Sequence, residues 1–320
     1  MPSPPWSWSP GDSTRSCGGH GGEVNVSRNR KEGTGSRVAL WLAAIVLSAA
    51  LLPATAEGRE TVLWAALDFP PFQIREGESK GSGSFDGLLD LLVNQLGDLD
   101  HDVVTMTFAR REEEIRRGHQ LCTPGLFRTP AREGLLEFSL PALIHLDNRL
   151  VFRAANKDRF EGSQPADLDA LLKRSDLVGG IVSERSFAPN IDPSIKQAAK
   201  QPNLLVRPLK SHQMFELLLR GEIDYTILFP HEAAYLARQQ RERPDIRLRP
   251  IAGTPPYIFT HVACTKGPWG EAMIGRINQV LLRHQRQAQY RALSERWYDE
   301  SDKMLIRKYY PLMLTPAAAP

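Results

Sequence analysis

The sequence has few cysteines, little excess charge and no familiar catalytic string. Three cysteines occur among 320 residues, and the formal net charge at pH 7 is +3. A charge so close to balance gives no case for nucleic-acid binding, which depends on an excess of Lys and Arg against phosphates. The sequence contains no P-loop, H-E-x-x-H or G-x-S-x-G string, and its eight histidines are scattered. These absences predict neither a bound metal nor a cofactor.

One uncharged apolar run stands out, at residues 38–52 (VALWLAAIVLSAALL). Basic residues precede it, and Ala54 and Ala56 after it form an A-x-A cleavage pattern. A basic flank, a short apolar core and a small-residue exit are typical of a secretory signal peptide. Because the run is shorter than the ~20 residues that cross a bilayer, we predict a signal peptide over 1–56, cleavage near Ala56 and export to the periplasm. An uncleaved N-terminal anchor is the alternative.

Residues 1–36 make an unusually long start to this leader, rich in Pro, Gly, Ser and Trp. This composition raises the hypothesis that translation begins near Val24 or Val26. Without residues 1–56 the net charge falls to near +1, which removes any remaining case for nucleic-acid binding. The remaining chain of about 264 residues suits two lobes better than one core.

After the leader, apolar strand patterns alternate with helical patterns at short spacing. Residues 61–67 (TVLWAAL) form a strand pattern that stops at the loop 68–72 (DFPPF), and Asp86 is placed to cap the helix that follows. This alternation predicts an α/β fold with largely parallel sheets. Further predicted strands are 102–108, 177–182, 204–208, 222–229 and 257–265; further helices are 110–117, 211–220, one that starts at Pro230, and most of 269–297.

Four short strings then occur in a recognisable order. They are the loop 68–72, residues 85–91 (FDGLLDL), residues 129–133 (TPARE) followed by 138–141 (FSLP), and residues 219–225 (LRGEIDY). They are similar, in this order, to the "PPF" loop, the "GFDVDL" helix start, the "T-x-x-R … F-S-x-P-Y" signature and the "L-x-x-G-x-x-D-A" string of one family. The chain after the leader thus resembles the family 3 periplasmic solute-binding proteins, which share their fold with ionotropic glutamate receptor ligand-binding domains.

The resemblance implies a two-lobed type II periplasmic binding fold. Each lobe would be a mixed, mostly parallel sheet flanked by helices, and two hinge crossings would join the lobes. Residues 57–152 and 257–310 would form the first lobe, 153–256 the second and 311–320 a tail. The ligand would bind between the lobes, at the carboxyl ends of the strands. The implied partners are a small-molecule ligand and a membrane transporter or sensor, and the implied state is a monomer.

Two cysteines, Cys122 and Cys264, remain after the leader. In an oxidising compartment a pair of cysteines suggests one disulfide, and two buried thiols are the alternative. The resemblance implies that the strand starting near Cys122 runs antiparallel beside the strand that holds Cys264, at the ends away from the cleft. A Cys122–Cys264 disulfide is therefore expected.

Arg132 is the first candidate for ligand binding, because by position it matches the arginine that holds a ligand carboxylate in this family. A guanidinium group offers two parallel N–H donors to a planar carboxylate. Thr129, a predicted helix cap just before it, would add a hydroxyl and backbone N–H groups. The alternative is an exposed helix arginine, or one that pairs with Glu133 or Glu137.

Other candidates come from both lobes. Phe69 and Phe72 would form either an aromatic wall over the ligand or a hydrophobic plug, and Asp68 would either accept a ligand amine or end its strand. In the second lobe Ser183, Arg185 and Ser186 follow a strand, where many relatives contact the ligand. Arg185 would supply a second contact to an anion or remain a solvated loop residue.

The chain departs from the amino-acid-binding pattern at two places. The acidic residue that anchors the ligand amine in amino-acid-binding relatives corresponds here to Phe229, and Phe127 replaces a small polar residue. An aromatic ring cannot pair with an ammonium by ionic contact, although it offers a π face. A ligand with a carboxylate and an apolar or aromatic body fits better, unless Glu232 shifts inward and restores the ionic contact.

These features predict a binding protein without catalytic activity, which closes on its ligand for transport or signalling. The alternative is a periplasmic enzyme on the same fold, similar to cyclohexadienyl dehydratase. Such an enzyme needs a general acid in the cleft, and Glu232, His212 and Asp68 are the candidates for that role.

Overall fold

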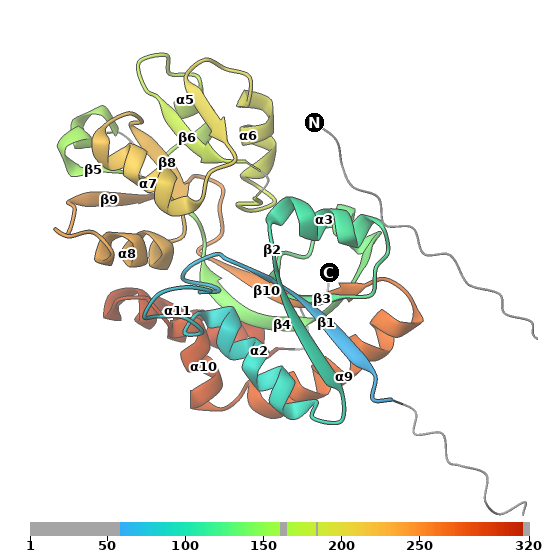
Figure 1. Ribbon diagram of the computed structural model, residues 1–320. Coiled ribbons are helices and arrows are strands. Elements are labelled where there is room, and N and C mark those ends of the chain that lie inside the picture. Colours follow the sequence, from blue (N-terminus) through green and yellow to red (C-terminus); the bar gives the residue numbers. More distant parts are fainter. Residues whose placement is uncertain (1–57, 161–164, 184, 316–320) are drawn as a thin grey trace, which may run out of the picture. The chain divides into compact units, whose positions relative to one another are not determined.

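The computed structural model describes residues 58–160, 165–183 and 185–315. The predicted signal peptide and its cleavage site lie outside these residues. Two five-stranded sheets carry the fold, one in each lobe (Figure 1). The predicted α/β class, with two lobes of mixed sheets flanked by helices, is confirmed.

The sheet of the first lobe has the strand order β2-β1-β3-β10-β4. β1 runs parallel to β2 and β3, whereas β10 returns from late in the chain and runs antiparallel to β3 and β4. Side chains alternate along β1, so Trp64 packs on one face of the sheet and Ala65 on the other. The strands are β1 (Thr61–Leu67), β2 (Asp100–Met106), β3 (Cys122–Leu126), β4 (Leu136–Leu146) and β10 (Tyr257–Thr265).

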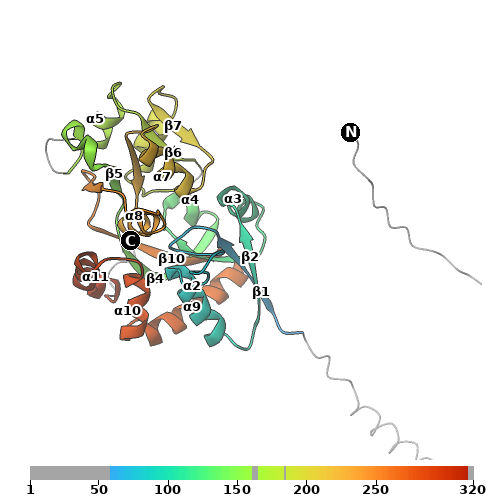
Figure 2. The same ribbon diagram turned by 60° about the vertical axis from the view of Figure 1, so that its left-hand side comes forward.

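Helices cover both faces of this sheet (Figures 1 and 2). On the Trp64 face, Leu88 of α2 and Ile277 of α9 enter the main core of the lobe, together with residues of α10 and α11. On the opposite face, Ile115 of α3 packs against Ala65. The helices are α2 (Ser84–Gln95), α3 (Phe108–Arg116), α4 (Pro130–Glu133), α9 (Pro268–His284), α10 (Ala288–Glu295) and α11 (Glu300–Met313).

The sheet of the second lobe has the order β7-β6-β8-β5-β9. β6 runs parallel to β7 and β8, and β5 runs antiparallel to β8 and β9. Helices α5 and α6 pack in one core, and α7 and α8 pack in another. The strands are β5 (Arg149–Arg153), β6 (Gly179–Val182), β7 (Leu204–Arg207), β8 (Tyr225–Leu228) and β9 (Ile246–Pro250); the helices are the 3-10 helix η2 (Ala154–Phe160), α5 (Leu168–Leu172), α6 (Asp192–Ala198), α7 (Ser211–Arg220) and α8 (Pro230–Arg238).

Two short crossings join the lobes. Asp147 and Asn148 connect β4 to β5, and residues 251–256 connect β9 back to β10. The first boundary, expected at 152–153, therefore moves to 147–148, because β5 pairs with β8 and β9 of the second sheet. The tail expected from residue 311 also starts later, because α11 continues to Met313, which is buried in the first-lobe core.

The predicted disulfide is present between Cys122 and Cys264. The two residues lie directly opposite each other in the antiparallel β3–β10 ladder, and neither is exposed. The disulfide thus ties the first part of the first lobe to the strand that returns from the second lobe. The alternative of two free buried thiols is excluded.

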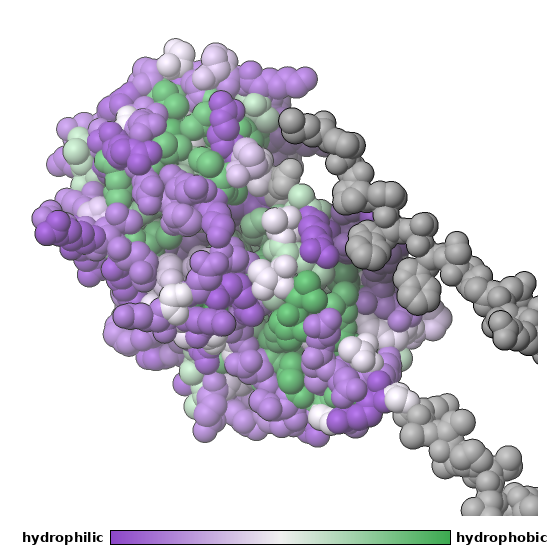
Figure 3. Space-filling view, in the orientation of Figure 1, coloured by the Kyte–Doolittle hydropathy of each residue, from purple (hydrophilic) through white to green (hydrophobic). Residues whose placement is uncertain are grey.

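Most of the surface in the view of Figure 1 is hydrophilic, and hydrophobic side chains gather over β1 and β2 (Figure 3). β2 is an edge strand, and Val103 on it is 41% exposed. Among the described residues, no helix combines the length and the apolar character that a membrane span requires.

Asp147, in the first crossing, is buried, with 4% of its surface exposed. Its Oδ1 accepts a hydrogen bond from the Asn148 N–H at 2.6 Å, and its Oδ2 has no partner among the described residues. Burial raises the pKa of Asp147 to about 6, although the hydrogen bonds from Asn148 oppose this. The crossing therefore contains a carboxyl group that is costly to ionise in the folded protein.

Reduction of the disulfide is expected to lower the free energy of unfolding by about 2–5 kcal/mol, because the bond closes a long loop in the unfolded chain. The cysteines are 142 residues apart. Urea unfolding with and without a thiol reductant measures this difference. The variant Cys122→Ser/Cys264→Ser is the control and should not respond to reductant. Equal stability of the natural protein in both conditions would contradict the expectation.

Asp147→Asn is expected to stabilise the protein at neutral pH and to have little effect below about pH 4. The folded state keeps the carboxyl proton up to about pH 6, whereas the unfolded state loses it near pH 4. The favourable contribution of Asp147 is thus complete below pH 4 and lost as the pH rises through 6. At pH 7 the gain on substitution should be about 3 kcal/mol.

Thermal and urea unfolding at pH 4 and pH 7 measure the effect of Asp147→Asn. Asp245→Asn is the matched control, because its side chain is 72% exposed at the start of β9. A gain that is the same at both pH values would show that ionisation of Asp147 is not the cause.

Candidate functional site

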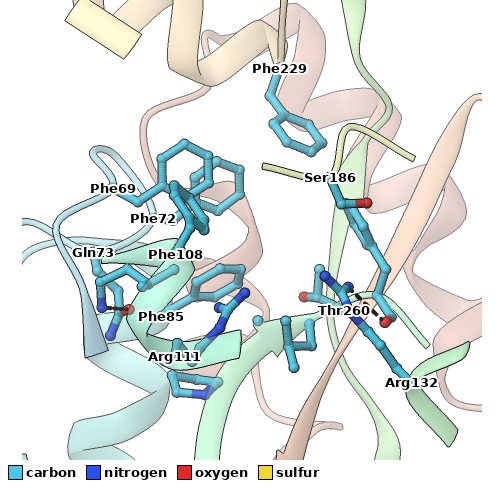
Figure 4. A pocket seen from close by; sticks show the side chains of 15 residues that line it. Phe69, Phe72, Gln73, Phe85, Phe108, Arg111, Arg132, Ser186, Phe229 and Thr260 are labelled. Carbon is cyan, nitrogen blue, oxygen red and sulfur yellow. Dashed lines mark hydrogen bonds between the residues drawn. The ribbon is translucent and has the colours of Figure 1, made fainter. Parts of the chain in front are cut away.

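A small cavity lies between the two lobes, next to the carboxyl ends of β1 and β3 (Figure 4). The second lobe contributes Ser186 and Phe229. The free volume is about 40 Å³, room for a few water molecules and far less than a typical ligand pocket. The first lobe contributes Leu67, Phe69, Phe72, Gln73, Phe85, Phe108, Arg111, Pro124, Gly125, Leu126, Phe127, Arg132 and Thr260.

Arg132 reaches this cavity from α4 (Figure 4). Thr129 caps the helix, because its side chain accepts a hydrogen bond from the Arg132 N–H, and Pro130 occupies the first turn. The guanidinium Nη1 donates to the Phe127 carbonyl at 3.2 Å, and Nη2 lies 3.6 Å from Glu112 Oε1. The capping role predicted for Thr129 is confirmed, and Arg132 is positioned at the cavity by a short, well-capped turn.

A second arginine, Arg111 of α3, also lines the cavity and was not predicted. It is 4% exposed, its Nη2 donates to Glu112 Oε1 at 2.9 Å, and its Nε has no partner among the described residues. Burial lowers the pKa of Arg111; Glu112 opposes this effect and the charge of Arg132 adds to it. The guanidinium groups of Arg111 and Arg132 both point into the cavity (Figure 4). Two cations therefore share one carboxylate oxygen.

Aromatic rings form most of the remaining wall. Phe72 is stacked on Phe69 with ring centroids 4.7 Å apart and meets Phe85 at 5.0 Å. It also contacts Phe229 of the second lobe edge-on at 5.0 Å, and Phe108 closes on Phe69 at 5.4 Å. Phe69 and Phe72 thus line the cavity and also pack against other aromatic rings. One aromatic cluster therefore has the position expected of a wall over the ligand and the packing expected of a hydrophobic plug.

Gly125 of β3 permits the tight packing of this cluster. Its φ is +81°, and a Cβ built there would lie 2.0 Å from the Phe85 ring. A side chain at this position would therefore meet both backbone strain and a steric clash. The approach of Phe85 to β3 depends on this glycine.

Arg185 and Glu232 form a buried ion pair in the second lobe. The two distances from guanidinium to carboxylate are 2.8 and 3.1 Å, and the side chains are 1% and 0% exposed. Glu232 also accepts a hydrogen bond from the Phe229 N–H, and Arg185 donates to Ser211 Oγ. Neither member of the pair lines the cavity. Glu232 has therefore not shifted into the cavity beside Phe229.

Asp68 and Ser183 border a second and larger space, a groove of about 820 Å³ between the lobes. Asp68 of the first lobe pairs with Lys210 of the second at 2.6 Å. His212 also lines this groove, whereas Ser186 lines the small cavity and donates to Asp192. The structure thus brings Arg132, Phe69, Phe72, Phe229 and Ser186 together at the small cavity, and Asp68 and Ser183 in the groove, where Phe69 also lies.

Two histidines near the first crossing have neutral rings. His231 is 1% exposed, and neither ring nitrogen has a partner among the described residues. It stacks on His145 at 5.5 Å and packs on Tyr298 at 4.4 Å. Burial lowers the pKa of His145 to about 3 and that of His231 well below its usual value. In the part of the chain that is described, no group of three His, Cys, Asp or Glu is placed to hold a metal.

Residues 62–300 match the bacterial extracellular solute-binding proteins, family 3. No curated protein matches the chain significantly. Among solved structures, AbpA from Streptococcus pneumoniae, an amino acid ABC transporter substrate-binding protein bound to L-arginine, is 16% identical; the match covers 74% of this chain and 94% of that chain, with a TM-score of 0.57.

Two further solved structures are similar. The periplasmic VFT2 domain of Bordetella pertussis BvgS is 20% identical over 83% of this chain and 99% of that chain, with a TM-score of 0.54. AncCDT-1, an ancestral amino-acid-binding protein and precursor of cyclohexadienyl dehydratase, is 17% identical over 75% of this chain and 95% of that chain, with a TM-score of 0.57. At these identities the likeness shows the fold.

Gly125→Ala is expected to lower the free energy of unfolding by about 2–4 kcal/mol, because the methyl group adds left-handed strain and a clash with Phe85. Gly253→Ala is the matched control: its φ is +77° and nothing lies within 4 Å of its Cβ position. The control should lose about 1–2 kcal/mol from strain alone. Urea unfolding measures both values, and equal losses would contradict the tight packing of Phe85 on β3.

Proposed function

This chain belongs to the bacterial extracellular solute-binding proteins, family 3, and on that premise we propose that its lobes close on a small ligand with a carboxylate and an apolar body. Arg111 and Arg132 would hold the carboxylate. The aromatic rings of both lobes would enclose the body. The observation that carries the proposal is the pair of guanidinium groups at the cavity, which share the single oxygen Glu112 Oε1.

The charges at the base of the cavity favour an anion. Two guanidinium groups face one carboxylate, so the cluster has one uncompensated positive charge, and the Arg111 side chain is only 4% exposed. The Nε of Arg111 is buried and has no partner among the described residues, and leaving such a donor unsatisfied is costly. A ligand carboxylate would supply both the missing charge and the missing acceptor, in a planar shape that suits guanidinium.

The rest of the ligand would lie against Phe69 and Phe108. These two residues line both the small cavity and the groove of about 820 Å³. The apolar part of a ligand whose carboxylate binds the two arginines would therefore have room to extend toward the groove. Entry requires the lobes to separate, because Phe229 and Ser186 of the second lobe close the cavity. The two crossings would serve as the hinge, and the ligand would stabilise the closed state.

The described residues that line the cavity include no His, Asp or Glu, the usual groups for acid catalysis. Of the candidates for a general acid, Glu232 is held by Arg185 and Asp68 by Lys210, while His212 lies in the groove. These placements support binding without turnover rather than a dehydratase-like activity.

The cellular role follows from the family and the leader. We infer export through the predicted signal peptide, cleavage near Ala56 and action as a monomer in the periplasm. Similar structures include a substrate-binding protein of an ABC transporter and a periplasmic domain of BvgS. The protein would therefore deliver its ligand to a membrane transporter or present it to a membrane sensor.

The proposal predicts that aromatic or aliphatic carboxylates raise the melting temperature, and calorimetric titration then gives their affinity. Arg132→Gln and Arg111→Gln should each weaken binding of such a carboxylate at least about tenfold, since hydrogen bonds to charged groups contribute about 1.5–3 kcal/mol. Arg128→Gln is the control, because that guanidinium pairs with Glu133 at 2.5 Å and does not line the cavity.

Two outcomes would contradict the proposal. Unchanged carboxylate affinity in Arg132→Gln would show that the anion binds elsewhere. Product analysis that detects chemical conversion of the bound carboxylate would favour a periplasmic enzyme on this fold over a binding protein.

A further inference from the structure

A buried carboxylate, that of Glu232, lies near the cavity but does not line it. Glu232 stands in the first turn of α8, three residues after Phe229, whose ring lines the cavity. Both Glu232 oxygens bind the guanidinium of Arg185, and one of them also accepts the Phe229 N–H. With 0% of its side chain exposed, Glu232 has no surface left for a ligand.

Arg185 is itself held firmly in place. Its guanidinium carbon lies 4.5 Å from the centre of the Phe187 ring and 4.8 Å from that of Phe69, and Nη1 also donates to Ser211 Oγ. Phe69 belongs to the first lobe and forms part of the cavity wall. Arg185 thus binds Glu232 while it contacts the wall of the ligand cavity, and both stacking and hydrogen bonds fix this position.

The described residues that line the cavity include Arg111 and Arg132 but no Asp or Glu. An ammonium group that enters would lose its water and meet two like charges, and none of these described lining residues would offer it an anion. Glu232 would be the natural counter-charge, but Arg185 neutralises it.

We propose that Arg185 is a specificity-determining residue, which sequesters Glu232 and so excludes ligands with an α-amino group. The site accepts organic acids without an amine in preference to the amino acids of the same shape. This inference rests on the proposed function, because it assumes that the carboxylate binds at Arg111 and Arg132.

The test compares ligand pairs that differ only in the amino group. Hydrocinnamate is matched with phenylalanine, and isocaproate with leucine, in calorimetric titrations of the natural protein. The deaminated acid of each pair should bind at least about tenfold more tightly, which corresponds to one strong charge interaction. Equal or tighter binding of the amino acids would overturn the inference and leave the proposed function intact.

The variant Arg185→Met frees Glu232 and should move the affinity ratio at least about tenfold toward phenylalanine and leucine. The double variant Arg185→Met/Glu232→Gln has no freed carboxylate, and its ratio should return to favour the deaminated acids. Arg159→Met is the matched control, because it breaks an Arg–Asp pair with Asp224 elsewhere in the second lobe. It should leave the ratio unchanged.

If the Arg185–Glu232 pair had only a structural role, its loss in Arg185→Met would lower the stability without changing the affinity ratio between deaminated acid and amino acid. An unchanged ratio in that variant would therefore overturn the inference. If Arg185→Met does not fold, Arg185→Gln is measured in its place, because it removes the charge of Arg185 but keeps a hydrogen-bond donor for Glu232, and the same shift of the ratio is expected. If neither member of a ligand pair binds the natural protein, the proposed function fails, and the inference fails with it.

Discussion

The meeting of two guanidinium groups at one carboxylate oxygen is the interaction on which the account of this protein depends. Arg111 and Arg132 come from different helices of the first lobe and share Glu112 Oε1. An added anion would balance the charges of such a cluster, and Arg111 in particular is buried. The fold supplies the surroundings: α3 and α4 present the arginines at the cavity, and Arg111 lies over the Phe108 ring. The proposed binding of an anion rests on this imbalance of charge.

In the second lobe, by contrast, each of two buried charges has a partner of opposite sign. Both carboxylate oxygens of Glu232 bind the Arg185 guanidinium, and aromatic rings of both lobes lie against that guanidinium, whose Nε has no partner among the described residues. The charges of this pair balance, whereas the arginine cluster of the first lobe lacks one negative charge. The contacts between Arg185 and Phe69, and between Asp68 and Lys210, join the two lobes on either side of the groove.

More of the fold than of the candidate site could be predicted from the sequence, because local patterns determine the strands and helices. The strand 61–67, the return strand 257–265, the disulfide and the place of Arg132 were predicted because each depends on a local pattern or a family string. Arg111 was missed because it lies in a run of charged residues, where its spacing of four from Ile115 is the signal that marks the buried face. The Arg185–Glu232 pair joins residues 47 positions apart, which no local pattern reveals. Asp86 was predicted to cap α2 but lies within its first turn, where its carboxylate binds the N–H groups of Ile74 and Gly83.

A crystal structure of the complex with hydrocinnamate shows whether the two arginines hold the ligand carboxylate. We predict lobes closed on the ligand, with its carboxylate oxygens within about 3.2 Å of guanidinium nitrogens of both Arg111 and Arg132. The phenyl ring would contact Phe69 and Phe108, and Arg185 would remain paired with Glu232. A carboxylate bound at Lys210 in the groove, or at Arg185 after its separation from Glu232, would contradict the account.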